Sequence, residues 1–235
     1  MIQAVAVRLP EDALTYLSRK PVQEFGKDRV IYGPEQPNNG LHLVVLGRVK
    51  VTTTSEEGYE TIARIVGVEG LFGESFLVGG RPMEAAVALD RASIMSWTRA
   101  EIEQHIEREP RLGIALSQYL VHQCILLQDR IESMAVHKTQ ERVMVALIQL
   151  AQMMGNPLPD GATRLASLTH HTIAEYVGTS REIVTFQMNR LKRLGIIRYT
   201  RQYIDVHTET VEKALREQGI RLSHQKPSAA GKAAS

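Results

Sequence analysis

The chain has 235 residues, of which 43% are hydrophobic and 23% charged, and its formal net charge is +2. These values are typical of one large or two small globular domains, and the small net charge means that any nucleic-acid-binding surface must be local. The single cysteine, Cys124, excludes an intramolecular disulfide framework and an all-cysteine metal cluster within one chain. No apolar run is long enough to cross a bilayer and the N-terminus lacks signal-peptide features, so we expect a cytoplasmic protein without a membrane partner.

Short β-type runs separated by turn residues extend from Val22 to about Ser96, after a short amphipathic helix predicted at Pro10–Lys20. Many short strands at regular spacing favour an antiparallel sandwich or jelly roll. The candidate strands are Val22–Phe25, Val30–Tyr32, Leu41–Leu46, Val49–Thr54, Thr61–Val66, Ala85–Leu89 and Ser93–Trp97. The side chains expected to be buried are those of Val44, Leu46, Val49, Val51, Ile62, Ile65 and Val87.

A long helix is predicted from Leu112 to Met134, after a small helix at Arg99–Arg108 and before a hinge at Ala135–Thr139. The apolar residues of the long helix cover more than one face. One face would therefore pack on its own domain and another on a second copy of the chain, in a coiled-coil-like homodimer seam. The alternative is the buried central helix of a monomer. The expected seam residues are Leu112, Leu116, Tyr119, Leu120, Gln123, Leu127, Ile131 and Met134.

Two short helices around a tight turn are predicted within residues 168–195, after another amphipathic helix at Arg142–Met154. Ala174, Gly178 and Val184 have the spacing of a helix-turn-helix. The small residue lets the helices approach, the glycine makes the turn, and the β-branched residue fills the crossing. The alternative is an ordinary helical hairpin inside an enzyme.

The second of these helices has the features of a DNA-recognition helix. Thr179 or Ser180 can cap its first turn, and Arg181 and Glu182 follow at the end that enters the major groove in such units. The hairpin predicted from Ile196–Tyr199 and Tyr203–Val206 would add a wing, which commonly lies on the phosphate backbone. A last helix is expected at Thr208–Gln218, and the Ser/Ala/Gly/Lys-rich residues 223–235 are expected to be disordered.

This order of elements resembles the CRP/FNR family of bacterial transcription regulators. The resemblance rests on Gly47-Arg48-Val49 with Gly67–Ser75, and on Ile173–Leu191 with its Thr-Ser-Arg-Glu run. It implies an α+β fold: an N-terminal antiparallel β-roll like that of cyclic-nucleotide-binding domains at 1–109, a dimerisation helix and hinge at 110–137, and a C-terminal winged helix-turn-helix at 138–222. It also implies double-stranded DNA, a second copy of the chain and RNA polymerase as partners.

The effector pocket that the resemblance implies is only partly conserved in this chain. Gly73 and Glu74, followed by Ser75, match the pair that meets the ribose in cyclic-AMP-binding members. The Arg-Ser pair that holds the phosphate falls on Glu84 and Ala85, where a carboxylate would repel it, although Arg81 is near. The adenine-binding pair of the family falls on Leu127 and Gln128. Activation by cyclic AMP is therefore not expected, and Glu74 can be a structural turn carboxylate.

The sequence also lacks the ligand sets of other effectors that the family uses. One cysteine cannot hold an iron–sulfur cluster, and the conceivable haem ligands, His42, His105 and Cys124, lie in no ligand motif. We therefore predict no cofactor and no metal. Cys124 as a redox switch and cyclic di-GMP as an effector remain open, and the leading interpretation is an empty pocket with activity set by the amount of protein.

The DNA contacts combine the chemistry of the residues with the resemblance. Arg181 can donate two hydrogen bonds to guanine, and Glu182 can accept from cytosine or orient the arginine. Phe186 stands where well-known members have a second arginine; it could touch a thymine methyl, or Gln187 could read a base if the helix is rotated. The predicted DNA-binding residues are Thr179, Ser180, Arg181, Glu182, Thr185, Phe186, His170, His171, Arg201 and Gln202.

Two other classes of function fit the sequence less well. An enzyme is not expected, because the chain has no nucleophile elbow, phosphate loop or metal-ligand motif. A cyclic-nucleotide-binding module without DNA function leaves the winged unit without a role. The sequence therefore predicts a homodimeric, sequence-specific transcription regulator that binds an inverted repeat, and the alternative is a regulator switched by cyclic di-GMP or cyclic AMP.

Overall fold

A computed structural model describes residues 11–79, 83–166, 168–217 and 219–220. Contacts within the chain divide it into two units, Met1–Thr52 with Ile65–Ile131 and Thr53–Arg64 with Glu132–Ser235. Arg81 and the tail predicted at 223–235 lie outside the described residues. Among the described residues, no helix combines the length and apolar character needed to span a membrane.

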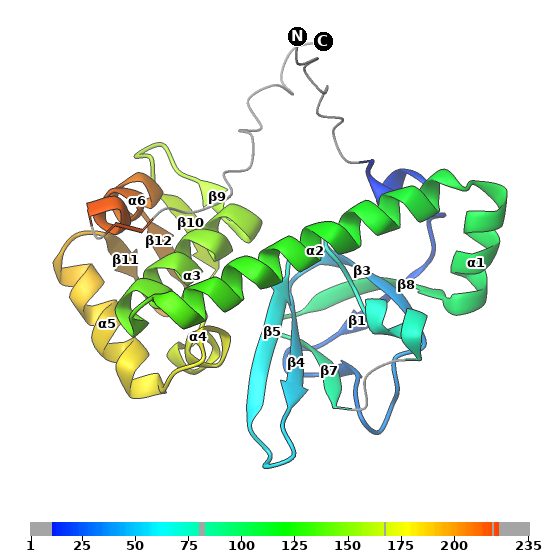
Figure 1. Ribbon diagram of the computed structural model, residues 1–235, viewed down its shortest axis with the longest axis horizontal. Coiled ribbons are helices and arrows are strands. Elements are labelled where there is room, and N and C mark those ends of the chain that lie inside the picture. The colour runs from blue at the N-terminus through cyan, green and yellow to red at the C-terminus, as the bar shows by residue number, and fades with distance from the viewer. Residues whose placement is uncertain (1–10, 80–82, 167, 218, 221–235) are drawn as a thin grey trace, which may run out of the picture. The chain divides into compact units, whose positions relative to one another are not determined.

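Two four-stranded sheets form the N-terminal β-roll (Figure 1), with the strand orders β1-β8-β3-β6 and β2-β7-β4-β5. All seven predicted strands are present, within one residue at each end. The two-residue strand β6 was missed, because a run that short carries no alternation. The strands are β1 (Val22–Phe25), β2 (Val30–Tyr32), β3 (Gly40–Leu46), β4 (Val49–Thr54), β5 (Glu60–Val66), β6 (Leu71–Phe72), β7 (Glu84–Ala88) and β8 (Ala92–Thr98).

Five of the seven side chains expected to be buried in the β-roll are buried. Leu46 is an exception: it is 54% exposed. The pairing of β3 with β8 shifts register between Val44 and Leu46, and such a bulge breaks the in–out alternation on which the prediction rested. Val87, on β7, is half-buried.

Short helical segments flank the strands of the β-roll. The helix predicted at Pro10–Lys20 shortens, within the described residues, to the 3-10 turn η1 (Ala13–Thr15), and a second such turn, η2 (Glu74–Val78), follows β6. Helix α1 (Arg99–Arg108) begins with a capping box, in which Thr98 accepts from the amide of Glu101 and the Glu101 carboxylate accepts from the amide of Thr98.

The long helix α2 (Arg111–Val136) packs its N-terminal half on the β-roll. Leu112, Ala115 and Leu116 belong to one buried cluster with Trp97, and the Tyr119 hydroxyl donates a hydrogen bond to a backbone carbonyl of β6 at 2.5 Å. The helix ends before His137, so the break between α2 and α3 is shorter than the predicted hinge.

The C-terminal domain consists of four helices and a small sheet with the strand order β11-β12-β10-β9. The predicted wing hairpin is present, and two strands that were not predicted, β9 and β10, extend it into this sheet. The remaining elements are α3 (Thr139–Met154), β9 (Asn156–Pro157), β10 (Thr163–Ala166), α4 (His170–Val177), α5 (Arg181–Arg193), β11 (Ile197–Tyr199), β12 (Tyr203–Val206) and α6 (Thr208–Glu217).

Candidate nucleic-acid interface

Helices α4 and α5 form the predicted helix-turn-helix. Gly178 follows α4 with a φ of +72°, and the amides of Gly178 and Thr179 both donate to the Ala174 carbonyl, at 2.9 and 3.0 Å. This left-handed position favours glycine, which explains why the turn can be tight. Ser180 then caps α5, since its hydroxyl accepts from the amide of Ile183. Val184 is fully buried, as its place at the crossing requires.

The first turn of α5 presents two charged side chains to solvent. Arg181 and Glu182 are both exposed. Hydrogen bonds from the Glu182 amide and from the Ser180 hydroxyl lower the pKa of Glu182, so its carboxylate is ionised at neutral pH. An exposed arginine beside a carboxylate at a helix N-terminus is suited to donate to guanine and to accept from cytosine.

The exposed fractions of Phe186 and Gln187 decide which of the two side chains can face DNA. Phe186 is 59% exposed, whereas Gln187 is only 9% exposed. The α5 helix is therefore not rotated to present Gln187, and Phe186 lies on the outer face. Within the described residues the Gln187 Oε1 atom has no hydrogen-bond partner, so this helix buries an unsatisfied amide oxygen.

His170 and Thr185, both predicted to contact DNA, form hydrogen bonds within their own domain. The Thr185 hydroxyl donates to the Arg181 carbonyl at 2.8 Å, so His170 Nδ1, 2.9 Å from the same hydroxyl, must be the donor to it. Burial and the charge of Arg181 lower the pKa of His170, which is therefore neutral at neutral pH and has a bare Nε2. The expectation of a weakly basic phosphate contact at His170 thus requires protonation; the neighbouring His171 pairs with Glu175 of its own helix at 3.2 Å.

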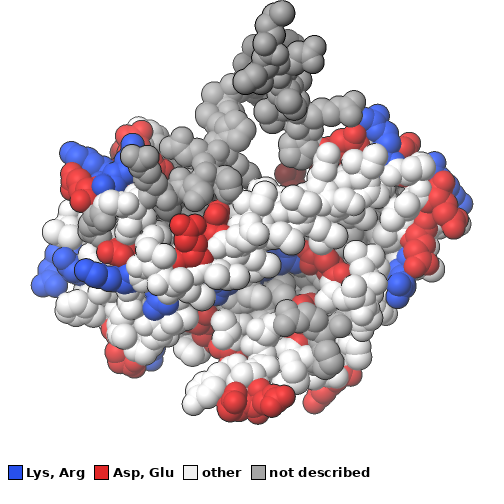
Figure 2. All heavy atoms as spheres, in the orientation of Figure 1, with Lys and Arg blue, Asp and Glu red and all other residues white. Residues whose placement is uncertain are grey.

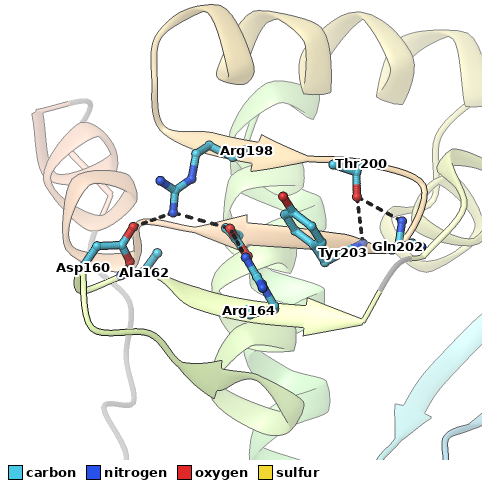
Figure 3. Close-up of polar contacts among 8 residues, drawn as sticks. Asp160, Ala162, Arg164, Arg198, Thr200, Gln202 and Tyr203 are labelled. Carbon is cyan, nitrogen blue, oxygen red and sulfur yellow. Dashed lines mark hydrogen bonds and ion pairs between the residues drawn. The ribbon is translucent and has the colours of Figure 1, made fainter.

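A tight turn joins the two wing strands. The Thr200 hydroxyl accepts from the amides of Gln202 and Tyr203, at 3.1 and 3.3 Å (Figure 3). This leaves the side chains of Arg201 and Gln202 exposed at the tip. Both predicted wing residues are therefore available to a phosphate backbone.

An ionic cluster below this turn stiffens the sheet (Figure 3). Asp205 is buried on β12 and accepts two hydrogen bonds from Arg164 of β10, at 2.7 and 2.9 Å. Arg198 of β11 bridges Asp205 and Asp160, and the Arg164 guanidinium lies 3.9 Å from the centre of the Tyr203 ring. Since three strands share these contacts, the cluster fixes the wing hairpin in one orientation. The cluster could not be predicted from the sequence, because Asp160 and Arg164 are far from Arg198 and Asp205 in the chain.

Basic side chains gather on the outer surface of this domain. In Figure 2, Lys and Arg atoms cluster over α5. The last turn of α5 carries Arg190, Lys192 and Arg193. Arg190 donates to Gln140 of α3 and so belongs to the packing of the domain, whereas Lys192 and Arg193 are exposed. A local positive surface thus exists despite the small net charge of the chain.

Comparison with known proteins identifies the family to which a chain with this arrangement belongs. Residues 22–109 match the model of the cyclic nucleotide-binding domain, and residues 141–216 match that of the Crp-like helix-turn-helix domain. The transcriptional regulator SdrP of Thermus thermophilus is 30% identical over 77% of this chain and 86% of its own length. The chain belongs to the CRP/FNR family of transcription regulators.

Other relatives agree with this CRP/FNR assignment. The global nitrogen regulator of Synechocystis is 28% identical over 79% of this chain and 84% of its own length. A solved structure of a CRP/FNR-family transcriptional regulator from Thermus thermophilus superimposes with a TM-score of 0.65 at 27% identity, covering 83% of this chain and 98% of that one. The predicted fold class and DNA-binding helix-turn-helix are therefore confirmed, and the family is one of regulators.

The effector region of this CRP/FNR chain is built around Glu84. The hydroxyls of Tyr32 and Ser75 both donate to Glu84 Oε1 at 2.8 Å, and within the described part of the chain these are its hydrogen-bond partners. Gly73 has a φ of +89°, and a Cβ there would lie 2.7 Å from the His42 ring. Ala85 is half-buried beside Glu84 on β7, and Glu74 is half-buried at the start of η2.

A second, neutral cluster adjoins this site. His42 is 7% exposed, its Nδ1 atom lies 2.8 Å from the Ser96 hydroxyl, and its Nε2 atom lies 3.0 Å from Asn38 Oδ1. Its ring packs against those of Tyr32 and Phe72, with centres 5.5 and 5.0 Å away, and the Tyr32 and Phe72 rings also contact each other, with centres 6.1 Å apart. Burial lowers the pKa of His42 to about 4. Among the described residues, no three His, Cys, Asp or Glu side chains are arranged to hold a metal ion.

The residues expected at the dimer seam divide into three groups on α2. Leu112 and Leu116 are buried in the core of their own β-roll and are not free to face a partner, which corrects that part of the seam. Tyr119, Leu120 and Gln123 are half-buried. The exposed members of the predicted seam are Leu127, Ile131 and Met134, and the exposed large apolar residues of α2 that were not predicted are Ile114, Val121 and Val136. Gln128 is exposed as well.

Proposed function

We propose that this CRP/FNR regulator binds a specific inverted-repeat DNA site as a homodimer and does so without cyclic AMP. The observation that carries the proposal is the exposed Arg181 in the first turn of α5, directly after the Ser180 cap. Arg181 would donate two hydrogen bonds to O6 and N7 of a guanine, and Glu182 would accept from the paired cytosine. Thr179, Ser180, Arg201 and Gln202 would contact phosphates, which fix the register on the duplex.

A seven-residue spacing of exposed residues on α2 supports the homodimer. Ile114, Val121 and Gln128 recur every seven residues, and Ser117, Cys124 and Ile131 follow each of them by three. These positions have the a/d spacing of a two-stranded coiled coil, with apolar side chains at Ile114, Val121 and Ile131 and polar ones at Ser117 and Gln128. They replace the seam residues that are buried in their own β-roll. In a symmetric dimer, the two α5 helices would occupy half-sites about 34 Å apart. RNA polymerase as a partner and a cytoplasmic location are expected because the chain belongs to a family of transcription regulators.

The Glu84 site argues against cyclic AMP as the activator. Its carboxylate is satisfied by two neutral hydroxyls, and an approaching phosphate would meet a negative charge. Calorimetric titration of the full chain with cyclic AMP should give no binding at millimolar ligand. Saturable binding that also raises DNA affinity would contradict the proposal, and the same result with cyclic di-GMP would support the nucleotide-responsive alternative.

Selection from a random duplex pool tests the DNA proposal. Purified, ligand-free protein at one stated near-physiological salt concentration should enrich a two-fold symmetric sequence. Arg181→Ala should lose roughly tenfold or more of the discrimination at one G·C pair in each half-site. Arg216→Ala, on α6, removes a similarly exposed arginine from the same domain and should leave the enriched sequence unchanged. Unchanged discrimination at every G·C pair in Arg181→Ala would show that this arginine does not read the base.

A further inference from the structure

The outer face of α5 continues beyond Arg181 into an open groove. Phe186, Asn189, Lys192 and Arg193 line this groove, whose volume is about 660 Å³. Their spacing of three and four residues places them along one side of the helix. Lys192 and Arg193 are suited to phosphates, which leaves Phe186 and Asn189 as the side chains of the groove that could distinguish bases.

Asn189 is held by the wing. The Tyr199 hydroxyl, on β11, donates a hydrogen bond to Asn189 Oδ1 at 2.9 Å. The Tyr199 ring is itself fixed by an edge-on contact with His170, with the ring centres 5.6 Å apart, and by Lys192 Nζ, 5.0 Å from the ring centre. An exposed asparagine would otherwise sample several rotamers, so this hydrogen bond selects one of them before DNA binds.

The same hydrogen bond decides which atoms of Asn189 remain for DNA. A free asparagine reads adenine by donating to N7 and accepting from the N6 amino group. Here the Tyr199 hydroxyl occupies one of the two lone pairs of the carbonyl oxygen. Because the oxygen and nitrogen of an amide diverge from the same carbon, this bond turns the –NH₂ group away from the tyrosine. Asn189 is thereby presented mainly through its –NH₂ donor, which suits an acceptor such as O4 of thymine.

Thymine carries the two groups that Asn189 and Phe186 are suited to recognise. Its major-groove edge carries the O4 acceptor next to the C5 methyl group, and Phe186, one turn before Asn189, offers an apolar ring to that methyl. Asn189 lies about 12 Å along the helix axis from Arg181, so its base would lie a few pairs from the guanine. We propose that Asn189, held by Tyr199, is a specificity-determining residue that selects thymine at this second position together with Phe186.

This inference rests on the proposed function and is tested with the full chain and the duplex obtained by selection. Asn189→Ala should lower the preference for thymine at one position of each half-site by about fivefold to tenfold, and leave discrimination at the G·C pair of Arg181 intact. Tyr199→Phe keeps the ring but removes the donor, so it should relax the same position. The double variant should lose no more than Asn189→Ala alone, because both changes remove one coupled unit.

A methyl-deletion series isolates the contribution of Phe186. Replacing each thymine in turn by deoxyuridine removes only the C5 methyl, and at the proposed position it should weaken wild-type binding several-fold. The same replacement should not weaken Phe186→Ala. Arg193→Ala is the matched control from the same groove, since Arg193 is not among the described contacts of Tyr199: it should weaken all sequences about equally and lower the salt dependence of binding, as a phosphate contact does.

Two results would overturn the inference while leaving the proposed function in place. One is a Tyr199→Phe protein, folded by circular dichroism, with wild-type discrimination at every position. The other is an Asn189→Ala protein that binds all sequences equally weakly, as is expected of Arg193→Ala. A wild-type protein that enriches no sequence would instead refute the proposed function, and the inference with it.

Discussion

The wing and the β-roll each contain a hydrogen-bonded carboxylate, and the partners are opposite in kind. Asp205 of the wing is buried and is bound by two arginines, whereas Glu84 of the β-roll is bound by two neutral hydroxyls next to a neutral, buried His42. The ionic cluster holds three strands in one orientation at any pH at which Asp205 is ionised. The cluster around His42 is stable only while the imidazole is uncharged. The two domains should therefore respond to acid at different pH values.

The largest expected effect comes from His42. Burial lowers its pKa from 6.5 to about 4, so the unfolded chain takes up the proton first as the pH falls. The β-roll should keep its full stability above pH 6.5 and lose about 3 kcal/mol between pH 6.5 and 4. Urea unfolding at a series of pH values measures this, with fluorescence of Trp97, the single tryptophan and a buried β-roll residue, as the probe.

Two variants separate His42 from the other histidines. His42→Gln should flatten the pH dependence of β-roll stability in this window, whatever its stability at neutral pH. His122→Gln, at an exposed site on α2, should retain the wild-type slope. If the pH dependence of the free energy of unfolding is the same in His42→Gln as in the wild type, another group causes the acid response. The proposed difference between the His42 and Asp205 clusters would then be wrong.

The next effect is expected in the wing. Asp205→Asn replaces an ionised, doubly bonded carboxylate and should destabilise the sheet by about 2 kcal/mol at neutral pH. The hydrogen bonds from Arg164 lower the pKa of Asp205 below 3.8, so this contribution is present above that pH and is lost only as the pH falls further. Hydrogen exchange of the β10 and β12 amides reports on this region separately from the β-roll.

Asp160→Asn is the control for the wing. Asp160 also pairs with Arg198, but its side chain is 45% exposed, so its loss should cost much less than that of Asp205. Equal protection of the β12 amides in wild type and Asp205→Asn would show that the ionic cluster does not hold the wing.

The smallest effect is expected at Glu84. Tyr32→Phe removes one of its two donors and should cost about 1 kcal/mol at pH 7, measured by Trp97 fluorescence during urea unfolding. Tyr59→Phe changes a tyrosine that is 75% exposed and should leave the midpoint unchanged. If Tyr32→Phe is as stable as the wild type, the Tyr32 hydroxyl does not stabilise the Glu84 carboxylate. The contrast drawn between Glu84 and Asp205 would then be wrong.

Features with a local cause were predictable from the sequence. The αL turn at Gly178, the Ser180 cap and the strand alternation each depend on a few adjacent residues, so the helix-turn-helix and the seven strands could be located. Leu46 was misplaced because a bulge is set by the partner strand β8. The burial of Leu112 depends on the β-roll core that receives it.

Pairings between distant residues could not be read from the sequence. Arg164 and Asp205 are joined only by the register of β10 with β12, and Tyr199 meets Asn189 only because the wing folds back on α5. The order of exposed and buried residues on α5, in contrast, could have been predicted from the helical spacing of the sequence. Asn189 follows Phe186 by one turn, and this spacing alone would have placed both on the outer face.

Dimer formation through the exposed residues of α2 would make the amount of the protein itself a variable of regulation. If two such helices pair through Val121, Cys124 and Ile131, the dimer population in dilute solution rises with the square of the monomer concentration. A modest rise in synthesis would then be amplified before any DNA is bound, and dilution by cell growth would be amplified in the opposite direction. A cell could in this way set the threshold of the response by how much of the chain it makes.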